Sequence, residues 1–196
     1  SAFSGCWAAE SVNYNANVAL DYTETSNVFK NVGINGNGCV VVVGNNVTNI
    51  PAYLFYCADE TEENTNNVIS VTIGSGVETI GALSFTGCIN MSTLIIGTSV
   101  KTIGIGAFAS CFALGNINIP NNVESVSDLA FAANLAATNI TIGTGVTTIG
   151  KQAFFSCVSV QTLNYNANVT TDYTSDAQIF TGLGVNSTTG SCDVIF

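Results

Sequence analysis

Apolar and polar residues alternate in short segments that recur along the chain. In the segment 116–120, NINIP, two isoleucines alternate with two asparagines, which is typical of a short strand with one buried face. We therefore expect Ile117 and Ile119 to point inward and Asn116 and Asn118 to point outward. A glycine or proline follows the strand and predicts a turn. A short VxxIG segment and an AFxxC segment come next, so each unit is expected to hold a second, shorter strand and a helical turn or short helix.

This unit repeats with a fixed period. Four copies place a phenylalanine every 23 residues, at Phe85, Phe108, Phe131 and Phe154. Such a period is typical of a solenoid, in which each unit buries its apolar face against its neighbours. The longer units carry the same marker at Phe3, Phe29, Phe55 and Phe180. We interpret the phenylalanine column as core, in preference to an exposed binding ridge, because large aromatic side chains dominate core packing.

The repeat covers the whole sequence. Regular 23-residue units occupy 69–163, and longer units of 26–30 residues occupy 1–68 and 164–196. The segment YNANV occurs at 14–18 and again at 165–169, so the end of the chain restarts the pattern of its beginning after 151 residues. We therefore predict one array over residues 1–196. Because Ser1 and Phe196 both fall inside a unit, we also expect this array to be part of a longer one.

Composition and charge narrow the possible functions. Hydrophobic residues make up 47% of the 196 residues and charged residues 8%, which excludes disorder. No apolar run reaches the roughly 18 residues that span a bilayer, so direct membrane insertion is not expected. Three lysines, no arginine and thirteen carboxylates exclude nucleic acid as a partner. The absence of histidine removes His-assisted hydrolysis, so we expect no enzyme, and we expect no metal or cofactor.

Three of the seven cysteines share one position of the repeat, which is occupied by Asn134 in the remaining regular unit. Adjacent units would place two such cysteines within disulfide range, so a cross-linked column is one interpretation. We favour the other, in which the thiols are reduced and buried, because free cysteine behaves as a small hydrophobic residue. Asn134 must then be hydrogen-bonded. The three cysteines are Cys88, Cys111 and Cys157.

The longest unit contains an acidic insertion, ADETEENTNN, at 58–67. Its carboxylates could bind Ca²⁺, which prefers clustered oxygen ligands. The insertion lacks the alternating spacing and central glycine of an EF-hand loop, so we favour a solvated, exposed loop. The carboxylates are Asp59, Glu60, Glu62 and Glu63.

The repeats LIIGTSVKTIGIGAFASC at 94–111 and NINIPNNVESVSDLAF at 116–131 resemble the BspA-like leucine-rich repeats of bacterial and protist surface proteins. The resemblance is strong over 69–163 and looser elsewhere. The chain departs from the family motif at Asn134, where the motif has cysteine, and glycine often replaces the proline at the strand end. The resemblance implies a right-handed leucine-rich-repeat superhelix of stacked short parallel strands with helical turns. It also implies a cell-surface or secreted location and adhesion to host or matrix proteins, with no catalytic motif.

The outward residues of the principal strands are the candidate ligand face. They are nearly free of charge and short, so they lose little entropy when ordered and offer hydrogen-bond donors and acceptors. One column is Thr72, Ile95, Asn118 and Thr141, and the flanking column is Ser70, Thr93, Asn116 and Asn139. The expected partner is a host or matrix protein or a glycan.

Two other functions stay open. The chain could be a structural spacer or stalk, which the sequence does not separate from a binding module. An enzyme acting on glycans is disfavoured because no regular unit has two carboxylates on its strand segment.

Overall fold

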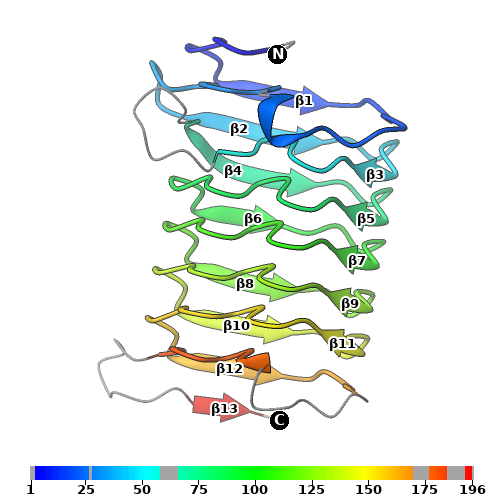
Figure 1. Cartoon of the computed structure of the whole chain (residues 1–196), viewed down its shortest axis with the longest axis vertical. Coiled ribbons are helices and arrows are strands. Elements are labelled where there is room, and N and C mark those ends of the chain that lie inside the picture. Colours follow the sequence, from blue (N-terminus) through cyan, green and yellow to red (C-terminus); the bar gives the residue numbers. More distant parts are fainter. Residues whose placement is uncertain (1–2, 27, 58–65, 170–176, 185–192, 196) are drawn as a thin grey trace.

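The computed structural model describes residues 3–26, 28–57, 66–169, 177–184 and 193–195. Within these ranges the chain winds into a stack of coils, each lying directly on the previous one (Figure 1). Each regular coil has three sides: a principal strand, a shorter second strand and a series of turns. The predicted solenoid of stacked parallel strands is therefore confirmed.

The principal strands lie side by side and parallel along one side of the stack (Figure 1). Their hydrogen bonds form two four-stranded sheets, in the orders β1-β2-β4-β6 and β13-β12-β10-β8. The strands are β1 (Ser11–Tyr14), β2 (Cys39–Val43), β4 (Val68–Ile73), β6 (Thr93–Ile95), β8 (Asn116–Ile119), β10 (Asn139–Ile142), β12 (Thr162–Tyr165) and β13 (Asp193–Ile195). In β8, Ile117 and Ile119 are buried and the two asparagines are exposed, as the alternation predicts.

The second strands form a parallel five-stranded sheet in the order β11-β9-β7-β5-β3. Each has two residues, of which the second, Ile or Val, is buried. They are β3 (Asn49–Ile50), β5 (Thr79–Ile80), β7 (Thr102–Ile103), β9 (Ser125–Val126) and β11 (Thr148–Ile149). A 3-10 helix, η1 (Glu24–Ser26), lies between β1 and β2.

The third side of each regular coil consists of tight turns, where a helical turn or short helix was expected. Amides alternate between two kinds of partner: Ala107 donates to Gly104 within its own coil, whereas Phe108 donates to Ala130 of the next coil. This alternation requires left-handed backbone two residues before and after the phenylalanine, as at Leu129 (φ 57°) and Ala133 (φ 58°). An α-helix would direct all its amides along the coil, so hydrogen bonding between coils excludes it.

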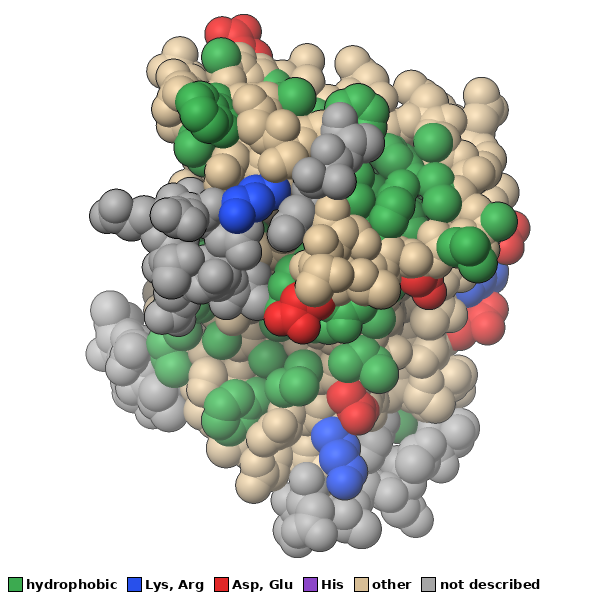
Figure 2. Space-filling model, turned by 45° about the horizontal axis from the view of Figure 1, so that its top comes forward, with side chains coloured by type: hydrophobic (Ala, Val, Ile, Leu, Met, Phe, Trp, Pro, Cys, Tyr) green, Lys and Arg blue, Asp and Glu red, His purple; other side chains and the backbone are tan. Residues whose placement is uncertain are grey.

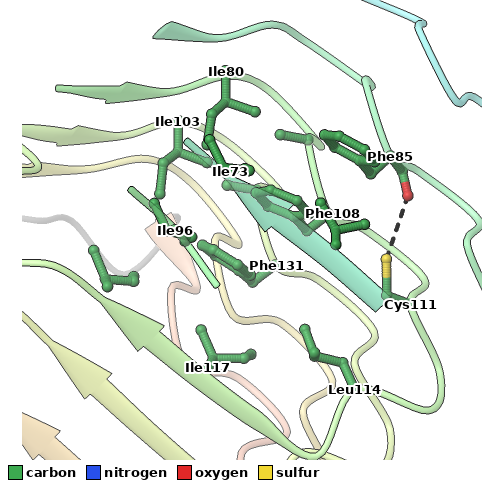
Figure 3. Packing of buried hydrophobic residues seen from close by; sticks show 14 of the residues in the cluster. Ile73, Ile80, Phe85, Ile96, Ile103, Phe108, Cys111, Leu114, Ile117 and Phe131 are labelled. Atoms are coloured by element: carbon green, nitrogen blue, oxygen red, sulfur yellow. Dashed lines mark hydrogen bonds between the residues drawn. The ribbon is translucent and has the colours of Figure 1, made fainter. Parts of the chain in front are cut away.

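The core runs through the centre of the stack as a column of aromatic rings. All eight marker phenylalanines stack on their neighbours, with ring centroids from 4.4 to 5.7 Å apart. Figure 3 shows Phe85, Phe108 and Phe131 in this column, with isoleucine side chains of the strands and Leu114 packed around them. The interpretation of the column as core is confirmed for the buried rings, while Phe3, at the start of the column, is half exposed.

The long unit fits into the stack through a local irregularity. Between β2 and β4 the register shifts, because Cys39 pairs with Val68 whereas Val40 pairs with Ser70. The acidic residues of the insertion lie outside the described residues. Asn66, expected in the exposed loop, is instead buried, and its amide donates to the Phe55 carbonyl at 2.9 Å. The prediction was wrong there because this amide satisfies a core carbonyl, which composition does not reveal.

Candidate binding face

The predicted ligand columns lie on the outer face of the principal strands. Thr72 of β4 is in register with Ile95 of β6, and Asn118 of β8 is in register with Thr141 of β10. The flanking column is aligned in the same way, with Ser70 beside Thr93 and Asn116 beside Asn139. The structure therefore brings each column together in two halves, one on each four-stranded sheet.

Hydrogen bonds between neighbouring coils order the side chains of the second half. The Asn139 amide donates to the Asn116 side-chain carbonyl of the preceding coil at 3.0 Å and, within its own coil, to the Thr138 hydroxyl at 3.3 Å. The Asn164 amide donates to the Thr141 hydroxyl at 3.3 Å. Because these side chains are already held in place, a ligand would pay less entropy to order them.

Two valines on this face were not among the predicted site residues. Val40 and Val42 of β2 are each 37% exposed, and Val42 stands in the same column as Thr72. Ile95, two coils further along that column, is 55% exposed. The signal was present in the run of four valines at 40–43, where alternate residues must point outward from any strand. The first half of the face is therefore more apolar than the second.

Charged side chains lie mostly away from these columns. Glu78, Lys101 and Glu124 are aligned beside the second strands, where the Lys101 amide donates to the Glu78 carbonyl at 2.8 Å. Lys101 Nζ lies 3.2 Å from Glu124 Oε1. Both side chains are exposed, so this ion pair contributes little stability. The view in Figure 2 shows few charged side chains, scattered among exposed hydrophobic ones.

The predicted cysteine column is buried and donates to core carbonyls. Cys111 Sγ donates to the Phe85 carbonyl at 3.4 Å (Figure 3), and Cys157 Sγ donates to the Phe131 carbonyl at 3.3 Å. Burial raises the pKa of the Cys157 thiol to about 11 and also raises the pKa values of the Cys88 and Cys111 thiols. A thiol that stays protonated at neutral pH is a poor nucleophile or metal ligand.

Asn134 takes the place of a cysteine in this column. It is fully buried, and its amide donates to the Phe108 carbonyl at 3.1 Å and the Phe131 carbonyl at 2.7 Å. The expectation that it is hydrogen-bonded is confirmed. Its Oδ1 atom, however, has no hydrogen-bond partner.

Within the described ranges, no three His, Cys, Asp or Glu side chains gather in a way that could hold a metal ion. The four carboxylates of the acidic insertion lie outside those ranges. No helix in the described part of the chain is long and apolar enough to cross a membrane.

The stacked parallel strands and the buried phenylalanine column define a leucine-rich-repeat solenoid. Residues 59–177 match the family model for the BspA type leucine rich repeat region in six copies. The chain therefore belongs to the BspA-type leucine-rich repeat family, as the resemblance of its motifs indicates. No curated protein matches the chain.

Two solved structures share the fold at low sequence identity. The T. pallidum leucine rich repeat protein TpLRR is similar to 80% of this chain, with 18% identity and a TM-score of 0.60. This similarity covers 64% of the T. pallidum protein, so the chain spans less than two thirds of its length. The pneumococcal vaccine antigen PcpA is similar to 96% of this chain and is covered over 68% of its own, with 15% identity and a TM-score of 0.50.

Proposed function

We propose that this chain is a non-enzymatic binding module of a secreted or cell-surface protein, and that it contacts its partner through the outer face of the principal strands. The observation that supports this proposal is the pair of uncharged columns from β4 to β10, whose second half is ordered by side-chain hydrogen bonds. Solenoids commonly use such extended faces for binding. A leucine-rich repeat family, and a vaccine antigen among the similar structures, are consistent with a surface protein that engages other macromolecules.

A catalytic role has less support. The chain has no histidine, and the described thiols of the cysteine column are buried with raised pKa values. The partner is proposed to be a host or matrix protein, because the face offers aliphatic and small polar contacts without an aromatic platform. A glycan partner and a purely structural spacer are the alternatives that the experiment separates.

The test measures saturable binding of the whole chain to immobilised matrix proteins, host-cell extracts and neutral glycans. Asn118→Lys and Thr141→Lys, which place a long charged side chain on the face, should each weaken binding by about tenfold or more. Thr147→Lys is the matched control, because Thr147 is also exposed but lies beside the second strands. Glu62→Lys tests the acidic insertion.

Each result has a defined meaning. Loss of binding in the face variants alone supports the proposal. Loss in Glu62→Lys alone places the interaction on the insertion and contradicts it. Saturable binding to glycans only replaces the protein partner with a glycan, and absence of all saturable binding favours the spacer.

A further inference from the structure

Cys6 and Cys39, the first two cysteines of the chain, lie near the N-terminal end of the stack, where β1 and β2 are side by side (Figure 1). Cys6 is exposed in the coil of β1, whereas Cys39 begins β2 and is fully buried. The hydrogen bond from Cys39 Sγ to the Val40 carbonyl is long, at 3.9 Å, so this thiol is weakly held.

Gly33 lies between the two cysteines and contacts both. Its amide donates to the Cys6 carbonyl at 3.1 Å. A Cβ atom added to Gly33 would stand 2.8 Å from the Cys39 Cβ atom, so Cys39 packs directly against this glycine. Pairing of the two strands fixes the same arrangement, because the Val40 amide donates to the Glu10 carbonyl at 2.9 Å. The two cysteines therefore lie one glycine apart on neighbouring coils.

This glycine adds no side chain of its own between the two thiols. Gly33 has a φ of 73°, in the left-handed region that glycine adopts without strain. The pKa of the Cys39 thiol is raised, chiefly by burial and then by the neighbouring Cys6 thiol, which agrees with their closeness. A disulfide needs a Cα separation of roughly 4.4–6.8 Å, and two residues that touch the same glycine come within reach of it.

We propose that Cys6 is a site of thiol–disulfide exchange with small disulfides such as glutathione disulfide, and that Cys39 then converts the adduct into a Cys6–Cys39 disulfide. The Cys6 thiolate attacks one sulfur of the small disulfide, forms a mixed disulfide and releases one thiol. Cys39 loses its proton to solvent, attacks the Cys6 sulfur and releases the second thiol. Two protein thiols are thus oxidised, and one small disulfide is reduced to two thiols.

Access to the reagent distinguishes this pair from the buried cysteine column. Cys88 and Cys111 also lie on neighbouring coils, but both are fully buried, so a dissolved disulfide does not reach either sulfur. Cys6 is exposed and receives the reagent first, which brings the reactive sulfur to the buried Cys39. The bond would join the coil of β1 covalently to the coil of β2.

Treatment of the reduced, folded whole chain with glutathione disulfide tests this proposal. After the free thiols are alkylated in denaturant, mass spectrometry of the peptides should find Cys6 linked to Cys39, with little glutathione left on Cys6. In Cys39→Ala, which lacks the second thiol, glutathione should stay on Cys6 as a stable mixed disulfide. Cys88→Ala is the matched control, because it also removes a fully buried cysteine but should leave the Cys6–Cys39 bond unchanged.

A lasting glutathione adduct on Cys6 in the unchanged chain would overturn the proposal. A bond from Cys6 to any other cysteine, or no reaction at Cys6, would do the same. Cys6→Ser keeps the test valid if Cys39→Ala does not fold, because it changes an exposed residue. In Cys6→Ser the Cys39 thiol should stay reduced, and its oxidation there would contradict the role of Cys6 as the point of entry. Thermal melting shows which variants are folded.

Discussion

At the scale of single residues, the position three residues after the phenylalanine of each regular unit has a definite physical task. Its side chain is buried and donates a hydrogen bond to the carbonyl of the preceding coil's phenylalanine. The donor is a thiol in Cys111 and Cys157 and a side-chain amide in Asn134. Cysteine suits the position because its weak donor is small and apolar. The amide of Asn134 makes stronger bonds but leaves its own oxygen without a partner.

Replacing Asn134 with cysteine should therefore stabilise the protein slightly. A buried oxygen without a hydrogen-bond partner destabilises the folded state by roughly 1–3 kcal/mol, and Asn134→Cys removes it. The substitution also loses one hydrogen bond, which contributes roughly 1 kcal/mol. The Phe131 carbonyl keeps the Cys157 thiol as a donor. We expect the free energy of unfolding, measured by urea denaturation, to rise by up to about 2 kcal/mol. Asn134→Ala, which supplies no donor, should lower it, and the reverse order of the two variants would contradict this account.

The buried thiols also predict a dependence of stability on pH. In the folded state burial raises the pKa of Cys157 to about 11, above the usual value near 9 that applies to the unfolded chain. The stability that the buried, protonated Cys157 thiol contributes is complete below pH 9 and is lost as the pH rises from 9 to 11. In this range the thiol ionises in the unfolded chain but stays protonated in the folded protein. Cys157 alone should lower the free energy of unfolding by roughly 2–3 kcal/mol across it. Cys157→Ser, whose hydroxyl does not titrate there, should reduce the slope.

Thiol titration provides an independent check of the cysteine column. In native protein near pH 8, Ellman's reagent should react with exposed Cys6 but not with Cys88, Cys111 or Cys157. In denaturant without reductant, most of the seven cysteines should react. Finding one reactive thiol or none under denaturing conditions would mean that the column is cross-linked.

At the scale of the element, the series of turns on the third side is the part of the coil that demands most of the backbone. The position two residues after the phenylalanine is left-handed in successive coils, with glycine at Gly87 (φ 74°) and alanine at Ala133 (φ 58°). A left-handed non-glycine residue costs roughly 1–2 kcal/mol. The hydrogen bonds to the next coil offset this cost, as with the Ala133 amide and the Phe155 carbonyl at 2.7 Å.

Gly87→Ala and Ala133→Gly, both at the position two residues after the phenylalanine, should change the free energy of unfolding by different amounts. In Gly87→Ala the new Cβ would overlap the Cys57 carbonyl oxygen, so the variant should lose roughly 2–4 kcal/mol of unfolding free energy. Ala133→Gly relieves the left-handed strain but frees the unfolded chain, so it should change stability by less than about 1 kcal/mol. Denaturant unfolding of the two variants measures both changes in unfolding free energy. Changes of equal size would show that backbone conformation alone sets the stability at this position.

At the scale of the whole molecule, coils contact only their neighbours in the stack, so stability should vary along it. Amides that join coils in the middle, such as Phe108 to Ala130 and Phe131 to Ala153, lie beside buried rings with a coil on each side. The amide of Asp193, which bonds to Gln161, belongs to β13, whose residues are all exposed.

Hydrogen exchange followed by mass spectrometry should reveal this gradient. We expect peptides from 100–155 to be the most protected and peptides that contain β1 or β13 to exchange much sooner. Phe108→Ala should cost about 3–5 kcal/mol and reduce protection chiefly in the adjoining coils. Uniform loss of protection over the whole stack would instead indicate a single cooperative unit.

The sequence by itself determined the repeat and the inside and outside of each coil. A 23-residue period, alternation in NINIP and a regular phenylalanine suffice for this, because burial of one face is a local property repeated in every unit. The columns of Thr72 with Ile95 and of Asn118 with Thr141 follow directly from that period. Membership of the BspA-type family was likewise visible in the motifs.

Only the tertiary structure decided what depends on contacts between coils. It replaced the expected helical turn with left-handed turns, because the amides there bond to the next coil. It buried Asn66 on the Phe55 carbonyl and divided the principal strands between β6 and β8. These features depend on the register between units and on which carbonyl lies opposite each donor. A periodicity read along one chain does not contain that information, because the partners meet only when the coils are stacked.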